Sequence, residues 1–298
     1  MRTLRKQNKV LFSFLSTLVA VCFLAQGTAF AAGRSGAGGG KMASFNVGKW
    51  AIGTAVGVAS SIGGSYASSA ISGKPFSFDA AFDKWGDNFV SNLANNQMSR
   101  AVGSMGAYYG WNPKATILVG SVLKSTVMTG IDADSMSAAG IGAIKGFASG
   151  AVMAAMANKK GQVSPVAGFL GGMAGNMVGG LAATGGDMDA AMSNMVKSIP
   201  GGLISMGIGY ATQKMKREDA YIVEQASLGL YEIADAGMAP AFKDMDKALK
   251  ISESSLQALA KYGQGGGYDK SNLYSNINYG SQGNINNQSY SPTWQKKW

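Results

Sequence analysis

Two pairs of aspartates have the residue type and spacing that could support chemistry. Asp132 and Asp134 form one D-x-D pair, and Asp187 and Asp189 form another. Paired carboxylates can bind Ca²⁺ or act as acid and base. Neither pair continues into an EF-hand loop, which needs further oxygen ligands and a Glu at its twelfth position. We therefore interpret these aspartates as helix caps, and we predict no metal site, no cofactor and no catalytic residue.

Composition excludes most other catalytic classes. The chain of 298 residues contains no histidine and a single cysteine, Cys22. Ser-His-Asp and Cys-His catalysis, His-ligated metals and Cys-rich zinc sites are therefore absent. The glycines of segment 140–146 do not have the G-x-G-x-x-G spacing of a dinucleotide-binding loop. We expect a protein that is not an enzyme and identify no small-molecule substrate; an enzyme using only Asp, Glu, Ser, Tyr or Lys is the remaining catalytic alternative.

The N-terminus has the pattern of an export signal. Four Lys or Arg residues in positions 2–9 precede an apolar run over 10–25, and Ala29-Phe30-Ala31 provides a small-x-small cleavage site. This pattern predicts a signal peptide over residues 1–31 and a mature chain that begins at Ala32. The expected location is the periplasm, the cell envelope or the extracellular space. A short membrane anchor and lipid attachment at Cys22 are the alternatives.

Composition divides the mature chain into four zones. Every acidic residue before position 214 is an aspartate, and the first glutamate is Glu218. Because aspartate favours helix N-caps over helix interiors, the acids of the first part should mark helix boundaries. The expected zones are a Gly-rich linker (32–44), a glycine-zipper helical-hairpin domain (45–213), an amphipathic helical hairpin (214–262) and a disordered tail rich in Asn, Tyr and Gly (263–298).

Small residues recur every fourth position through the glycine-rich zone. This spacing keeps the small residues on one helical face, whereas the alternation typical of strands is not sustained anywhere. A glycine in a helix interior costs up to about 1 kcal/mol relative to alanine, so close helix–helix packing must compensate. We predict an all-α fold in which the following glycines lie at helix contacts: Gly53, Gly57, Gly142, Gly146, Gly150, Gly171, Gly175 and Gly179.

A degenerate internal repeat indicates pairs of helices. Pro113 and Pro165 begin similar apolar stretches 52 residues apart, and Asp79, Asp132 and Asp187 follow helix-ending glycines at similar intervals. Proline at a first helical position and aspartate at a cap are physical helix boundaries. We predict Gly/Ala-rich hairpins used about two and a half times, with these three aspartates as caps. A polar hairpin whose second helix begins at Pro240 should follow, before the disordered tail.

Membrane contact or self-association is the expected mode of action. Small-xxx-small faces drive helix association in lipid, and the uncharged runs 51–73 and 163–184 are long enough to span a bilayer. In the tail, Trp294 and Trp298 are candidates for a membrane interface. Nucleic acid is not an expected partner, because the net charge of +10 is not gathered in a dense basic patch.

The run from Gly171 to Gly180, with its glycines four residues apart, resembles glycine-zipper proteins of the bacterial cell envelope. The repeated Gly-rich helical pairs are also similar to the apolar stretches of secreted polymorphic toxins. The first resemblance implies an envelope role, and the second implies a role in delivery. We therefore expect a secreted, non-enzymatic helical envelope protein that associates with membrane or self-assembles through its striped helices. The alternative is a membrane-inserting, pore-forming or toxin-delivery accessory protein.

Overall fold

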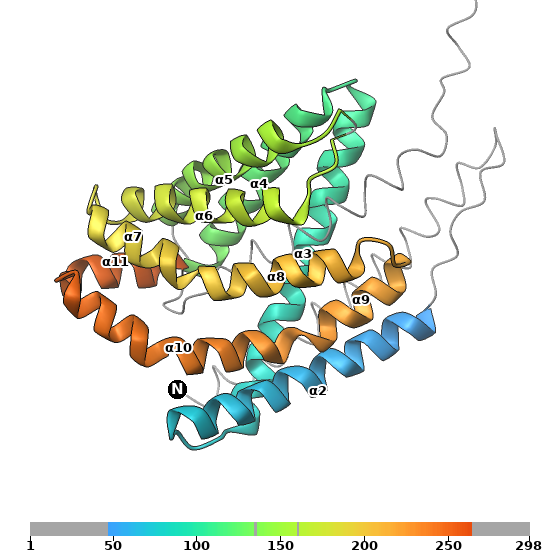
Figure 1. Cartoon of the computed structure of the whole chain (residues 1–298). Helices are drawn as coiled ribbons and strands as arrows, with labels where there is room; N and C mark the ends of the chain where they lie inside the picture. The colour runs from blue at the N-terminus through green and yellow to red at the C-terminus, as the bar shows by residue number, and fades with distance from the viewer. Residues whose placement is uncertain (1–46, 134–135, 160, 264–298) are drawn as a thin grey trace, which may run out of the picture.

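The chain is all-α wherever its structure is described. The computed structural model describes residues 47–133, 136–159 and 161–263, and no strand occurs among them (Figure 1). The predicted signal peptide and linker, and the tail with Trp294 and Trp298, lie outside the described residues.

The described helices follow one another with short connections. In chain order they are α2 (Val47–Ser72), α3 (Phe78–Tyr108), α4 (Pro113–Ala133), α5 (Met136–Met156), α6 (Pro165–Ala183), α7 (Met188–Lys197), α8 (Ile199–Thr212), α9 (Arg217–Ala226), α10 (Leu228–Ala248) and α11 (Glu253–Gly263). Pro113 and Pro165 each begin a helix, as their fixed φ and missing N–H favour.

Helices α4, α5 and α6 form a layer in which α5 lies between the other two; we call it the three-helix layer (Figure 1). Helices α3, α8 and α11 pack against this layer, α3 on α4, α8 on α6 and α11 on all three. A second group forms around α2, which packs against α9 and α10. Of the polar helices of residues 214–262, α9 and α10 thus pack directly on the first glycine-striped helix, whereas α11 packs on the three-helix layer.

The glycine stripe of α5 faces α4. A Cβ atom at Gly146 would lie 2.8 Å from Val122 Cα, and one at Gly142 would lie 2.8 Å from Thr129 Cβ. A Cβ at Gly150 would lie 2.9 Å from Ser121 Cβ. The two helices therefore approach one another closely enough that the contact leaves no room for a side chain on α5.

The other two stripes contact helices of the same chain in the same way. On α6, Gly171 and Gly175 face α5, and Gly179 faces both α5 and α11. On α2, Gly53 lies under the Tyr221 ring and Gly57 lies under the Gln225 side chain, both on α9. The stripes are thus enclosed within the protein.

The three aspartates expected as caps have different positions. Asp187 is the N-cap of α7, and its carboxylate accepts a hydrogen bond from a backbone N–H. Asp79 is not a cap: Ser77 caps α3, and Asp79 lies in the first helical turn, where its charge still complements the helix dipole. Asp132 is not a cap either, because it lies within the last turn of α4, which continues three residues past the helix-ending glycine expected at Gly130.

Pro240 does not begin a helix; it lies inside α10. Proline in a helix interior removes a backbone hydrogen bond and costs about 3 kcal/mol. Buried residues on both sides of Pro240, Leu228 and Tyr231 before it and Phe242 after it, fix the two halves of α10 against the body of the protein. This packing offsets the cost and keeps the helix continuous.

Two adjacent glycines of α2 provide a direct test of close helix approach. A Cβ at Gly64 would lie 2.7 Å from the Gly229 carbonyl oxygen on α10, whereas a Cβ at Gly63 meets nothing within 4 Å. Gly64→Ala should therefore lower the free energy of unfolding by about 1–3 kcal/mol. Gly63→Ala should raise it by up to about 1 kcal/mol through helix propensity. Chemical denaturation of both variants measures the difference, and shifts of the same sign would contradict the packing described.

Candidate functional site

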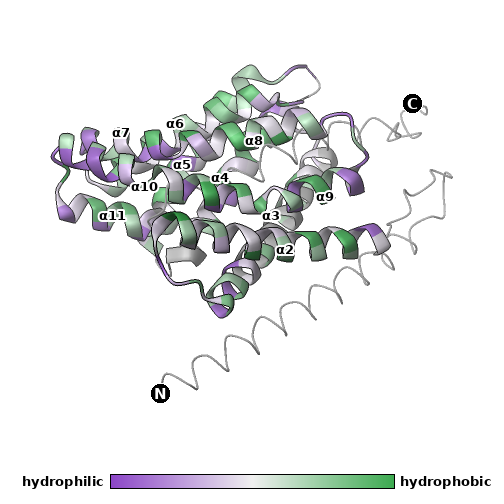
Figure 2. Ribbon diagram, turned by 60° about the horizontal axis from the view of Figure 1, so that its bottom comes forward, coloured by the Kyte–Doolittle hydropathy of each residue, from purple (hydrophilic) through white to green (hydrophobic). Residues whose placement is uncertain are grey.

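The outer face of the three-helix layer carries no charge among the described side chains. On α4, Leu123 and Val127 are exposed, and on α6, Leu170 and Val178. On α5 the exposed residues fall on one face at helical spacing: Gly140, Ile144, Phe147, Ala151 and Ala155. Purple, hydrophilic residues gather at helix ends and turns in Figure 2. We call these exposed positions of α4, α5 and α6 the apolar face.

The charged side chains within the layer point inward instead. Lys124 is the charged residue in the middle of α4, and Lys145 is that of α5; each is only 4% exposed. A lysine is almost never fully buried in a water-soluble protein unless it is paired, and exposed surfaces are normally rich in charge. The layer therefore departs from the usual arrangement: two lysines lie in its interior beside apolar residues such as Ile117 and Met153, and large apolar side chains also lie on its surface.

Lys124 is buried without a hydrogen-bond acceptor among the described residues. The hydroxyls of Ser121 and Ser125, its neighbours on α4, are also buried without a partner there. Burial disfavours the charged ammonium and lowers the pKa of Lys124 to about 7. Near neutral pH this side chain therefore changes between an amine and an ammonium inside the protein.

Lys145 lies beneath α11. Its Nζ is 5.3 Å from the centre of the Tyr262 ring, which is the geometry of a cation–π contact. Burial raises the pKa of the Tyr262 phenol. Because Gly179 lacks a side chain, the ring can pack directly against α6, where a Cβ would lie 2.7 Å from Tyr262 Cζ. Helix α11 thus covers the polar side of the layer.

The titration of Lys124 predicts a pH dependence of stability. An unfolded lysine has a pKa near 10.5, so between pH 7 and 10 the unfolded state binds more protons than the folded state. The free energy of unfolding should therefore rise by about 2 kcal/mol from pH 7 to pH 9 and fall again on acidification. Chemical denaturation at several pH values from 6 to 9, below the range in which tyrosines ionise, measures this change in the free energy of unfolding.

Lys124→Met should remove this pH dependence and stabilise the protein at pH 7, since it fills the same space without a charge. Lys114→Met, on an exposed lysine at the start of the same helix, is the matched control and should leave the pH dependence in place. If the free energy of unfolding of Lys124→Met depends on pH as steeply as that of the parent, another group causes the pH dependence.

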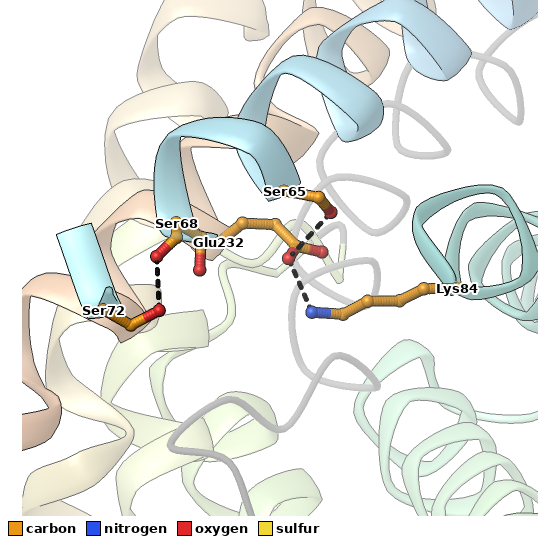
Figure 3. Close-up of polar contacts among 5 residues, drawn as sticks. All are labelled: Ser65, Ser68, Ser72, Lys84 and Glu232. Atoms are coloured by element: carbon orange, nitrogen blue, oxygen red, sulfur yellow. Dashed lines mark hydrogen bonds and ion pairs between the residues drawn. The ribbon is translucent and has the colours of Figure 1, made fainter. Parts of the chain in front are cut away.

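A buried carboxylate, that of Glu232 on α10, holds three helices together. It accepts hydrogen bonds from Lys84 Nζ of α3 at 2.6 Å and from Ser65 Oγ of α2 at 3.3 Å (Figure 3). The Glu232 side chain is only 8% exposed, so little water reaches its negative charge, and these two donors stabilise it instead. In Figure 3 the Ser72 hydroxyl donates to the backbone carbonyl of Ser68, one turn earlier in α2, and not to the carboxylate. Both donors bind the same oxygen, Oε2, so this carboxylate links α2, α3 and α10.

Breaking this pair from one side should destabilise the protein. Lys84→Met leaves the Glu232 carboxylate with only the Ser65 hydroxyl, so we expect a loss of about 1–3 kcal/mol, less than for a fully buried pair because Lys84 is half exposed. Adding Glu232→Gln should recover part of that loss in a double-mutant cycle. Lys247→Met, which breaks an exposed 3.8 Å pair with Asp244, should have no measurable effect. Equal losses in both lysine variants would contradict the role of Glu232.

The aspartate pairs do not form a carboxylate centre in the described part of the chain. Hydrogen bonds from the Ala190 backbone and from Ser255 Oγ lower the pKa of Asp187. Asp189 is exposed in the first turn of α7, and Asp134 lies outside the described residues. No group of three or more acidic, His or Cys side chains that could hold a metal ion occurs over residues 47–133, 136–159 and 161–263.

Sequence reasoning missed a row of aromatic side chains on α3. Phe82, Trp85 and Phe89 follow one another with ring centres 5.4 Å apart, and Trp50 of α2 joins Phe89 at 6.2 Å. The spacing of three and four residues could have indicated this row, because such residues share one helical face. The row joins α2 to α3, and its exposed end begins at Phe78.

Among the described helices, α5 and α6 are long and apolar enough, by length and composition, to cross a bilayer. A core helix of a soluble protein can pass the same test, and 33% and 44% of their most apolar windows are buried here. Helix α2, which contains most of the uncharged run 51–73, does not pass it. Serine and glycine dilute the hydropathy of α2 without adding apolar surface.

Comparisons of the chain with protein-family models, with curated proteins and with solved structures gave no match. The functional argument therefore rests on the geometry of the chain itself.

Proposed function

We propose that this protein is an exported, non-enzymatic protein of the bacterial cell envelope whose three-helix layer associates with a membrane through its apolar face. The observation that carries the proposal is the unusual distribution of charged and apolar side chains in the layer. Lys124 and Lys145 lie inside, while Phe147, Ile144 and Leu123 are 40–59% exposed.

The physical argument concerns contact with water. A contiguous exposed apolar surface on one face marks an interaction site or a membrane contact, whereas scattered apolar residues need no explanation. Here three neighbouring helices of 21, 21 and 19 residues, each about 30 Å long, all expose large apolar side chains near their middle. Placing this face against lipid would remove its apolar area from water without burying a charge, since the described side chains on it are uncharged.

Self-assembly through the glycine stripes has less support. Each of the eight glycines lies against another helix of its own chain, where even a methyl group would collide. A stripe that is already occupied offers no surface to a second copy. The apolar face is the part of the layer that is available for an external contact.

The pore-forming alternative is supported by one specific observation. Lys124, Ser121 and Ser125 of α4 have buried polar atoms without a hydrogen-bond partner among the described residues, and Ser121 lies against α5. If α4 and α5 separated, these groups would meet water inside an inserted bundle. Release of a dye from vesicles would favour this alternative, and binding without release would favour surface association.

The finer organisation of the fold belongs to the same proposal. We infer that α4–α5 and α6–α7 are two copies of the helix-pair repeat, since each begins at a proline. Helices α9 and α10 then act as a polar hairpin that encloses the stripe of α2.

A charge placed on the apolar face tests the proposal. Phe147→Asp should reduce sedimentation of the purified protein with phosphatidylcholine vesicles by about tenfold, because a carboxylate opposes burial in lipid. Leu230→Asp, at a comparably exposed apolar residue of α10, is the matched control and should bind like the parent. Circular dichroism verifies that both variants fold. Absence of vesicle binding by the parent, or equal losses in both variants, would contradict the proposal; a parent that forms dimers dissociated by Phe147→Asp would assign the face to a second copy.

A further inference from the structure

The two ends of the three-helix layer differ in charge. The start of α4, the end of α5 and the start of α6 lie at one end, because a Cβ at Gly161 in the α5–α6 connection would lie 2.6 Å from Pro113 Cβ. The end of α8 joins them there, since a Cβ at Gly209 would lie 3.2 Å from Pro165. The opposite end contains the end of α4, the start of α5 and the turn into α7.

Lysines gather at the first of these ends. Lys114 begins α4 and Lys159 follows α5, while Lys214 and Lys216 follow α8; all four are exposed. Of the acids that come next in the chain, Asp219 is paired with Lys49 at 2.5 Å and Glu218 is half-buried. We call this set of four lysines the basic end.

Two aspartates lie at the opposite end, where Asp187 and Asp189 begin α7. The described parts of α5 and α6, and the connection between them, contain no acidic residue.

Exposed aromatic rings lie beside the basic end. Tyr109 and Trp111 stack with their ring centres 6.1 Å apart, immediately before α4 begins at Pro113. They are 65% and 36% exposed. Trp and Tyr side chains favour the headgroup level of a bilayer, where one part of the ring is apolar and the other is hydrated.

From these observations we propose that the basic end recognises an anionic lipid bilayer. Lys114 and Lys159 contact the lipid phosphates, and Tyr109 and Trp111 sit at headgroup level. The layer is tilted so that its basic end lies nearer the bilayer than Asp187 and Asp189 do. The inference rests on the proposed function and adds to it both the lipid class and the orientation. Attraction of a lysine to an anionic surface strengthens binding by about fivefold per residue and is screened by salt.

The test compares two variants of equal net charge. Lys114→Gln/Lys159→Gln removes two lysines of the basic end, and Lys243→Gln/Lys247→Gln removes two exposed lysines of α10, which packs on α2 and α8 instead of the layer. Each purified protein, with its N-terminus established by mass analysis, is sedimented with vesicles of phosphatidylcholine containing increasing fractions of phosphatidylglycerol. Circular dichroism and thermal melting verify that the exposed substitutions leave the fold intact.

We expect the parent to bind more tightly as phosphatidylglycerol increases and to lose this gain in high salt. The increase in affinity caused by phosphatidylglycerol should be at least about tenfold smaller for the basic-end variant than for the parent. The α10 variant should lose little. Equal losses in the two variants would mean a general attraction by net charge, and a parent insensitive to phosphatidylglycerol would equally overturn the inference. Binding to pure phosphatidylcholine should be the same for all three proteins. If the parent does not bind pure phosphatidylcholine, that result contradicts the proposed function.

Discussion

Close contact between helix faces that lack side chains is the constraint on which the rest of this structure depends. Where α5 lies on α4, the glycines at 142, 146 and 150 let the backbone of one helix contact the backbone and small side chains of the other. Dispersion attraction over such a contact compensates for the poor helix propensity of glycine. The same contact joins α6 to α5 and α2 to α9 and α10, so one packing mode recurs in both halves of the protein.

This packing mode determines where the large apolar side chains lie. Where a helix contact is made by glycine and serine, large apolar residues such as Phe147, Ile144 and Leu123 lie on other faces, which are open to solvent in the three-helix layer, although Ile117 and Met153 still fill part of its interior. In an ordinary soluble helix the large side chains fill the core and the outer face carries charge. The apolar face and the small residues at the helix contacts of the layer therefore both follow from the same close, glycine-mediated packing of helices.

The buried charges follow from the same geometry. Because α4, α5 and α6 pack closely, Lys124 and Lys145 are buried, and the Tyr262 ring of α11 covers Lys145. The charge of Glu232 is paired, because Lys84 and Ser65 donate hydrogen bonds to its carboxylate from two other helices. One buried charge thus joins three helices, while another stays unpaired among the described residues and makes the layer sensitive to pH.

The sequence by itself determined the helical class and several helix boundaries, among them the starts of α4, α6 and α7, because first-position prolines and the cap at Asp187 act within one or two turns. It placed the caps wrongly at Asp79 and Asp132 and a helix start at Pro240, since Ser77, the continuation of α4 and the packing around α10 prevailed over local preference. Only the tertiary structure decided which way Lys124 and Lys145 point, that Lys84 reaches Glu232, and that the stripes are occupied within the chain. Those outcomes depend on which helix faces meet, and contacts between residues far apart in the chain leave no periodic signal in a single sequence.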